Sequence, residues 1–216
     1  MKQLIIYDLD GTLVDTREDI ARSANHMLAE MGLSAISKEE VARYVGRGLF
    51  QLVQSCLKTD DPKKIEKGAK IYRAYYAEHM LDHSELYSGA REILEHFKGR
   101  KQGVLTNKPN PFSEDLLKAL GVGNYFEMIV AGDSEYPKKP SPAAVHAMMH
   151  RWKISAQDTL FIGDSLVDIE TARNAGVEIA VVSHGFSSRK ELQSASPEIL
   201  VSGFQELLEK LKGLQW

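Results

Sequence analysis

The chain has 216 residues, of which 43% are hydrophobic, 8% aromatic and 26% charged, a composition typical of a globular protein that can bury a core. Its formal net charge of -3 excludes a strong positive field that would attract nucleic acid or an anionic membrane, so a small soluble partner is expected. Cys56 is the only cysteine, which excludes an intramolecular disulfide and fits a reducing cytoplasm. The apolar run 4–7 is too short for a signal peptide or a membrane span, so we expect a cytoplasmic protein.

Short apolar runs alternate with longer stretches of helical periodicity, which is typical of parallel strands joined by helices. The predicted strands are Leu4–Tyr7, Gln102–Leu105, Met128–Val130, Thr159–Ile162, Ile179–Val182 and Ile199–Val201. The predicted core helices are Pro111–Leu120, Pro142–Trp152, Leu166–Ala175 and Gln205–Leu211, with C-caps at Gly121, Gly176 and Gly213. This alternation predicts an α/β fold with a doubly wound parallel sheet.

The segment between the first two predicted strands breaks this rhythm, because it contains no convincing strand. Its amphipathic stretches predict helices at Thr16–Met31, Lys38–Tyr44, Leu49–Leu57 and Pro62–Leu81. We therefore expect a helical cap domain at residues 16–82. It would be inserted into an α/β core domain formed by residues 1–15 and 83–216.

Polar residues directly follow three of the predicted strands. They are Asp8 to Thr12 after the first strand, Thr106-Asn107-Lys108 after the second, and Gly163 to Asp168 after the fourth. Ligands of an open parallel sheet bind beyond the carboxyl ends of its strands, so we expect these residues to converge on one site.

Four aspartates in this crevice, Asp8, Asp10, Asp164 and Asp168, would repel one another unless a cation or protons neutralised them. Oxygen ligands without a paired His or Cys favour magnesium over zinc. An EF-hand calcium loop is excluded, because Leu13 and Asp19 stand where that loop needs Gly and Glu. Lys108 and Lys139 are available to offset the charge of a phosphate group.

The motif Asp8-Leu9-Asp10-Gly11-Thr12 resembles the first motif of the haloacid dehalogenase-like phosphatases, and the other motifs follow in order. Thr106 resembles the hydroxyl of the second motif. Lys139, chosen over Lys138 by its register to Pro140, resembles the lysine of the third. Residues 163–168 resemble the acidic fourth motif, and the insertion resembles the helical cap of the phosphoglycolate phosphatase-like subgroup.

This resemblance implies a role for each site residue. Asp8 would be the nucleophile that forms a phosphoaspartyl intermediate, and Asp10 would be the general acid and base. Phosphate would be bound by Thr106, Asn107 and Lys139. Magnesium would be held by Asp8, the backbone carbonyl of Asp10, Asp164 and Asp168.

The loop Val45-Gly46-Arg47-Gly48-Leu49 resembles the cap specificity loop of the subgroup, with Gly46 and Arg47 as specificity residues. We therefore expect a phosphatase of a small phosphorylated metabolite, with 2-phosphoglycolate as the best single substrate, acting as a monomer or a dimer. A phosphosugar mutase or a pyrophosphatase would keep the same core residues. A phospho-accepting signalling domain is a third alternative, although the cap and Asp10 count against it.

Overall fold

The computed structural model describes residues 2–213 and contains a six-stranded parallel sheet with the spatial order β5-β4-β1-β6-β7-β8. The strands are β1 (Leu4–Tyr7), β4 (Lys101–Leu105), β5 (Met128–Val130), β6 (Thr159–Gly163), β7 (Glu178–Val182) and β8 (Ile199–Val201). Three of the predicted strands have the predicted bounds, and the other three are one residue longer. Numbered in chain order, the sheet reads 3-2-1-4-5-6, so the predicted doubly wound fold is confirmed.

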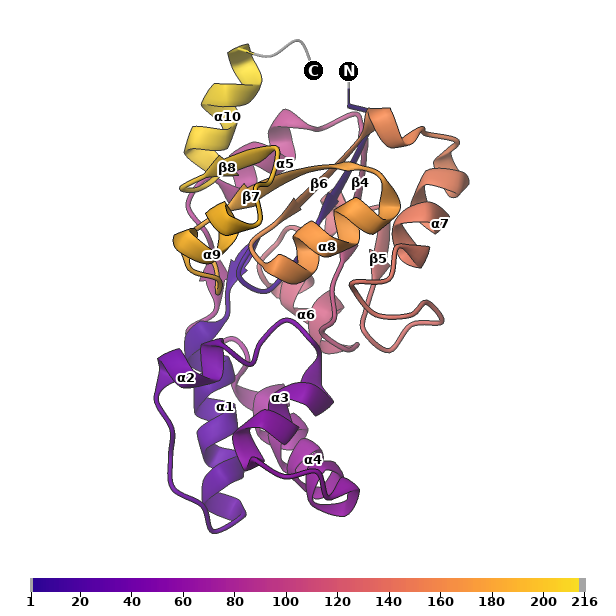
Figure 1. Cartoon of the computed structure of the whole chain (residues 1–216). Coiled ribbons are helices and arrows are strands. Elements are labelled where there is room, and N and C mark those ends of the chain that lie inside the picture. Colours follow the sequence, from indigo (N-terminus) through magenta and orange to yellow (C-terminus); the bar gives the residue numbers. More distant parts are fainter. Residues whose placement is uncertain (1, 214–216) are drawn as a thin grey trace.

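Helices cover both faces of this sheet (Figure 1). The side chains of the central strand β1 alternate, because Ile5 and Tyr7 pack in one apolar layer while Leu4 and Ile6 pack in the other. The first layer is closed by α5 (Ala90–His96), α6 (Phe112–Ala119) and α10 (Phe204–Gly213). The second is closed by α7 (Ala143–Trp152), α8 (Leu166–Ala175) and α9 (Arg189–Ser194). All four residues of β1 are fully buried, which is why this strand reads as a continuous apolar run.

The core helices differ from the predictions mainly at their ends. Gly121 and Gly176 follow α6 and α8 with φ of +67° and +69°, as expected for glycines that end a helix. The predicted cap at Gly213 is wrong, because α10 extends to that residue. Helices α5 and α9 were not predicted, since they have 7 and 6 residues and are too short to show a clear helical period.

The first four helices after β1 form a separate group beside the sheet (Figure 1, purple). They are α1 (Arg17–Glu30), α2 (Lys38–Ala42), α3 (Leu49–Leu57) and α4 (Pro62–His79). Each predicted cap helix is present, with ends that differ by at most two residues. Their apolar sides form a cluster of their own, which Phe112 of α6 joins, so this helical group also packs on the core.

The expectation that no strand occurs between the first and second predicted strands was wrong. The strands β2 (Val14–Asp15) and β3 (Glu85–Leu86) pair antiparallel and flank the four helices. Strands of two residues carry no detectable period, which is why the sequence pattern did not show them. The domain division at residues 15/16 and 82/83 stays a prediction, and both boundaries lie on the helical side of this strand pair.

No helix within residues 2–213 is both long enough and apolar enough to cross a membrane.

Candidate active site

The acidic residues of the site follow two neighbouring strands. Asp8 comes directly after β1 and Asp164 directly after β6, and these strands pair with Tyr7 opposite Ile162. The backbone N–H of Asp8 donates to the carbonyl of Ile162 at 2.9 Å, which extends the pairing to the site. The two strands flank the point at which the strand order reverses, where doubly wound folds bind their ligands.

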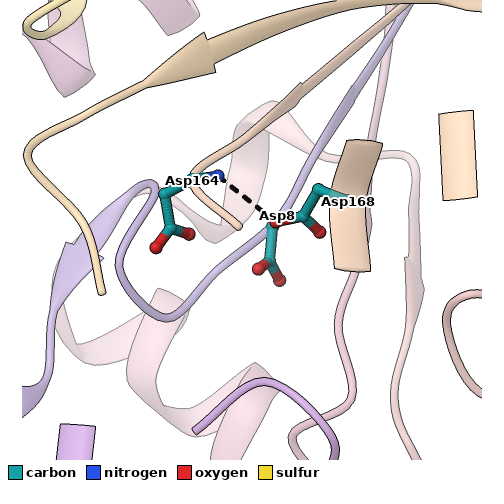
Figure 2. A group of neighbouring side chains, drawn as sticks. All are labelled: Asp8, Asp164 and Asp168. Carbon is teal, nitrogen blue, oxygen red and sulfur yellow. Dashed lines mark hydrogen bonds between the residues drawn. The ribbon is translucent and has the colours of Figure 1, made fainter. Parts of the chain in front are cut away.

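Asp8, Asp164 and Asp168 form a buried cluster in which one carboxylate oxygen from each residue lies within 4.8 Å of the others (Figure 2). Asp168 is in the first turn of α8, shortly after Asp164, so two segments that are far apart in the sequence contribute to the cluster. The predicted convergence of these three carboxylates is therefore present in the structure.

The two carboxylate oxygens of Asp8 differ in their surroundings. Oδ1 accepts a hydrogen bond from the N–H of Leu9 at 2.7 Å and lies 2.8 Å from Nζ of Lys139. Among residues 2–213, no hydrogen bond to Oδ2 is found. Burial raises the pKa of Asp8 from 3.8 to about 7, although Lys139 partly offsets this effect. One oxygen of this buried carboxylate is therefore available to react with a substrate.

The ammonium group of Lys139 lies between two of the acidic residues, Asp8 and Asp168. Its Nζ lies 2.8 Å from Asp8 Oδ1 and donates to Asp168 Oδ1 at 2.7 Å. Burial by itself lowers the pKa of Lys139, but the carboxylates of Asp168 and Asp8 outweigh burial and raise that pKa above its ordinary value. Lys139 is therefore charged at neutral pH. The adjacent Lys138 instead has its Nζ close to Gly48 of the cap.

Asp164 is fixed by two hydrogen bonds from other loops. Oδ1 accepts from the hydroxyl of Thr12 and Oδ2 from the N–H of Phe186, both at 2.7 Å. Burial and the neighbouring carboxylates of Asp168 and Asp8 raise the pKa of Asp164 well above its ordinary value. Gly185 lets this loop approach closely, since a Cβ there would lie 2.1 Å from Asp164 Oδ2.

Asp168 is held by the start of its own helix. Ser165 is the N-cap of α8, and Oδ2 of Asp168 accepts from the N–H and the hydroxyl of Ser165 at 3.0 and 2.6 Å. The other oxygen, Oδ1, accepts from Lys139. Both oxygens of Asp168 are therefore engaged within the protein, which suits a residue that supports the cluster and orients Lys139.

The cluster fits a hard divalent cation. Asp8, Asp164 and Asp168 are buried close together, and Asp8 and Asp168 pair with the ammonium of Lys139. Burial and neighbouring carboxylates raise the pKa values of Asp8 and Asp164, an effect that a bound cation would offset. An all-oxygen donor set is what magnesium prefers. The carboxylate of Asp10, the fourth aspartate expected in this crevice, is not part of the cluster.

Asp10 belongs to a second polar group. Its Oδ1 accepts from the hydroxyl of Thr16 and from Nζ of Lys108, each at 2.8 Å. Nζ of Lys108 also donates to the hydroxyl of Tyr76 on α4, at 2.7 Å. The side chains of Lys108 and Asp10 are 6% and 12% exposed, so this ion pair is largely shielded from water.

The loop after β4 connects both polar groups to the cap. Thr106 accepts from the N–H of Lys108 through its hydroxyl oxygen, at 3.1 Å. The side-chain amide of Asn107 donates to the carbonyls of Gly46 and Lys139 at 2.8 and 3.1 Å, and its oxygen accepts from the N–H of Lys139 at 2.9 Å. The Asn107 side chain therefore ties the cap loop to the backbone of the site lysine.

A cavity of about 60 Å³ lies between the cap and these residues. Among the predicted site residues, it is lined by Asp8, Asp10, Gly46, Thr106, Asn107, Lys139 and Asp164. The cap and its surroundings add mainly apolar side chains, namely Ile20, Val45, Leu49, Leu52, Tyr72, Tyr76, Phe112 and Phe186. Arg47 is exposed and does not line the cavity, although both neighbouring glycines do.

Sequence reasoning assigned no role to Thr12, Thr16, Tyr76 or Phe186, all of which contact the site. Phe186 lies shortly after the end of β7, so the rule that sites form at the carboxyl ends of strands could have found it. The sequence carries no comparable signal for Tyr76, because an aromatic residue on an amphipathic helix usually belongs to a core.

The fold and the site define a doubly wound α/β protein with a buried acidic centre under a helical cap. The profile of the Haloacid dehalogenase-like hydrolase family matches residues 5–182. The phosphoglycolate phosphatases of Vibrio parahaemolyticus and Pseudomonas fluorescens are each 33% identical to the chain and cover 96% of it; the alignments cover 95% and 79% of those proteins. The chain belongs to the haloacid dehalogenase-like hydrolases.

Solved structures agree with this assignment. A predicted phosphoglycolate phosphatase from Haemophilus somnus superposes with a TM-score of 0.92 at 28% identity, covering 97% of this chain and 98% of that one. A predicted phosphatase from Clostridium acetobutylicum gives a TM-score of 0.86 at 26% identity, covering 99% and 100%.

Proposed function

We propose that the chain is a magnesium-dependent phosphatase that hydrolyses 2-phosphoglycolate through a phosphoaspartyl intermediate on Asp8. The observation that carries this proposal is the pair of environments of the Asp8 carboxylate. Lys139 and the Leu9 N–H hold one oxygen, while the other has no hydrogen bond within residues 2–213, and Asp8 lines the cavity. The relatives named phosphoglycolate phosphatase support the choice of substrate.

The size of the cavity supports a small substrate. A volume of about 60 Å³ corresponds to roughly two water molecules, because each occupies about 30 Å³ in the liquid. A two-carbon phosphate ester exceeds this volume by less than a sugar phosphate does, so it requires a smaller movement of the cap. This comparison favours phosphoglycolate over the substrates of a phosphosugar mutase.

In the first step, Oδ2 of Asp8 attacks the phosphorus atom, and the bond between phosphorus and the ester oxygen breaks. Asp10 gives its proton to the departing oxygen, so glycolate leaves as an alcohol. Lys139 and Thr106 hold the phosphoryl oxygens as charge moves onto them. The side chain of Asn107 keeps Lys139 in place through the backbone contacts described above.

In the second step, Asp10 removes a proton from water, and the resulting hydroxide attacks the phosphorus of the aspartyl phosphate. The acyl phosphate bond breaks, inorganic phosphate leaves, and the Asp8 carboxylate is restored. Magnesium would be held by Asp8, Asp164 and the Asp10 carbonyl, with Asp168 in support, and would neutralise charge between the carboxylates and the phosphate.

The test is a measurement of phosphate release from 2-phosphoglycolate and from a panel of phosphorylated metabolites, with magnesium and with excess chelator. We expect the highest specificity constant for phosphoglycolate and no turnover in chelator. Full activity in chelator would remove the metal from the mechanism. A sugar phosphate or pyrophosphate as the best substrate would overturn the substrate assignment.

A further inference from the structure

One hydroxyl group of the cap contacts the site through a lysine of the core. Tyr76 lies on α4, is 1% exposed, and accepts a hydrogen bond at 2.7 Å from Nζ of Lys108, which belongs to the core. The same Nζ donates at 2.8 Å to Asp10, the residue to which the proposed function gives the proton transfers. A single ammonium group therefore joins a cap side chain to the proposed acid and base.

The position of Tyr76 is well determined by its packing. Its ring stacks on Tyr72, with centroids 5.5 Å apart, and meets the edge of Phe112 at 5.3 Å. Nζ of Lys108 also lies 4.5 Å from the centre of the ring, close enough for a cation–π attraction. Burial raises the pKa of Tyr76 well above its ordinary value, so the hydroxyl is neutral and acts as an acceptor for the ammonium.

The geometry points to Tyr76 as a positioning residue for Asp10. Its hydroxyl holds the Lys108 ammonium against the Asp10 carboxylate, so this pair is fully supported while α4 lies over the core. When the cap moves away, Lys108 loses one of its two partners, and Asp10 loses part of the support that fixes it. The inference rests on the proposed role of Asp10 in proton transfer.

The neighbouring residue supports this coupling independently. Asn107 donates to the Gly46 carbonyl in the cap and, through the other N–H of its amide, to the Lys139 carbonyl in the core. Two consecutive residues of one loop thus each join a cap residue to a residue of the proposed machinery. The loop after β4 therefore carries one contact from the cap to Asp10, through Lys108, and one from the cap to Lys139, through Asn107.

The experiment compares Tyr76→Phe with the wild type on two esters in the presence of magnesium: the alkyl phosphate that the wild type hydrolyses best, and p-nitrophenyl phosphate. The first has a poor leaving group that needs protonation, and the second has a good one. We expect kcat on the alkyl ester to fall by about tenfold, the lower range for a lost hydrogen bond to a charged group. On p-nitrophenyl phosphate, kcat should fall by less than about threefold, with KM nearly constant on both esters.

Tyr72→Phe is the matched comparison, because it removes the same atom from a buried tyrosine one helical turn earlier. No hydrogen bond from Lys108 to Tyr72 is found in the described part of the chain. Any loss caused by Tyr72→Phe should be equal on the two esters. A leaving-group dependence for Tyr76→Phe alone separates positioning of Asp10 from a general effect on cap packing.

Lys108→Met supplies the second half of the test. If Tyr76 acts through Lys108, adding Tyr76→Phe to Lys108→Met should cost no further activity, whereas independent effects would multiply. Equal losses on both esters, or multiplying losses in the double variant, overturn the inference. Should Tyr76→Phe fail to fold, Lys108→Arg decides the matter. This variant keeps the charge and the donors, so it should restore the leaving-group profile that Lys108→Met changes.

Failure of the proposed function gives a different result. A wild-type protein without turnover on any phosphate ester, or an Asp10→Asn variant with equal losses on both esters, would remove the acid–base role itself. A different outcome would overturn only the inference about the cap. In that case the wild type turns over normally and the loss caused by Asp10→Asn depends on the leaving group, but Tyr76→Phe has the same activity as the wild type on both esters.

Discussion

Burial disfavours the charged form of the Asp8 carboxyl group, and this effect is the basis of its proposed reactivity. Burial raises its pKa to about 7, and the Lys139 ammonium only partly offsets the effect. Asp164 is in the same condition, with Asp168 and Asp8 as its charged neighbours. A bound cation would offset this effect of burial on both carboxyl groups.

The first prediction concerns Asp8. Asp8→Asn should abolish turnover while leaving the fold intact, because an amide is a poor nucleophile and one of the charged metal ligands is lost. Steady-state phosphate release and the circular dichroism spectrum of the purified variant provide the measurement. Activity near that of the wild type would exclude a phosphoaspartyl intermediate on this residue.

The second prediction concerns Asp10, whose carboxylate lies beside Lys108 and Thr16. Asp10→Asn should lower kcat by roughly two to four decades on alkyl phosphates, the usual contribution of general acid–base catalysis. The loss should shrink on p-nitrophenyl phosphate, whose leaving group needs no proton. Kinetics on the two esters measure this difference; losses of the same size would argue against protonation of the leaving group.

At the scale of elements, the site depends on how closely the loops at the carboxyl edge of the sheet approach one another. The loop after β5 packs on the loop after β4, where the N–H of Gly132 donates to the Lys108 carbonyl at 2.9 Å. A Cβ at residue 132 would lie 2.2 Å from the carbonyl oxygen of Asn107, which is a backbone atom and has little freedom to move. Glycine at this position lets the segment 107–108 reach its place in the site.

The third prediction follows from that contact. Gly132→Ala should lower the free energy of unfolding by about 1–3 kcal/mol or more, as for other overpacked sites, and should also lower kcat. Gly123→Ala is the control, because the nearest atom to its new Cβ would be 3.7 Å away, an ordinary contact distance. Urea unfolding measures both variants. Equal stability of the two would mean that the loop at 132 adapts freely.

The cap loop 45–48 is the second element with a testable role. Gly46 and Gly48 have φ of +108° and +90°, a region that suits glycine, and both line the cavity. Arg47 lies between them but is exposed, so contact with a substrate requires this loop to turn as the cap closes over a ligand.

The fourth prediction tests that movement. If Arg47 pairs with the carboxylate of phosphoglycolate, Arg47→Ala should lower kcat/KM for phosphoglycolate by roughly one to two decades, as for a lost charged hydrogen bond. Activity on p-nitrophenyl phosphate, which has no carboxylate, should stay within about threefold of the wild type. A parallel fall on both substrates, or none on either, would leave the arginine as a surface residue.

At the scale of the whole molecule, the buried acidic cluster links folding to pH and to metal binding. Between pH 3.8 and about 7, Asp8 holds a proton in the folded protein that it has lost in the unfolded chain. Without metal, its contribution favours the folded state at low pH and is lost as the pH rises through that window. A bound cation would replace the proton, so we expect the effect of metal on stability to grow over the same range.

The fifth prediction is that magnesium raises the melting temperature more at pH 8 than at pH 5. Thermal unfolding at both pH values, with and without the metal, measures the difference. Asp8→Asn serves as the control, since it removes the titrating carboxyl and should reduce the pH dependence. If magnesium stabilised the protein equally at the two pH values, the protonation of Asp8 would not be linked to metal binding.

The sequence by itself determined the fold class and the position of the three clustered aspartates. The central strands β1 and β6 contain continuous apolar runs because both faces of the sheet are covered, and Asp8 and Asp164 directly follow these strands. Side-chain patterns of this kind are local, so they can be recognised without knowing which segments meet. The two-residue strands β2 and β3 and the short helices α5 and α9 were missed because they are too short to show a period.

Only the tertiary structure decided which side chains meet across the cap and the core. The contacts of Lys108 with Tyr76 and of Asn107 with Gly46 join residues 32 and 61 positions apart, and no local pattern encodes them. The placement of Arg47 outside the cavity also depends on how the cap helices pack, not on the glycines beside it. Local sequence fixes the residues that end each strand, whereas contacts between distant segments depend on the packing of whole elements, which is a property of the folded chain.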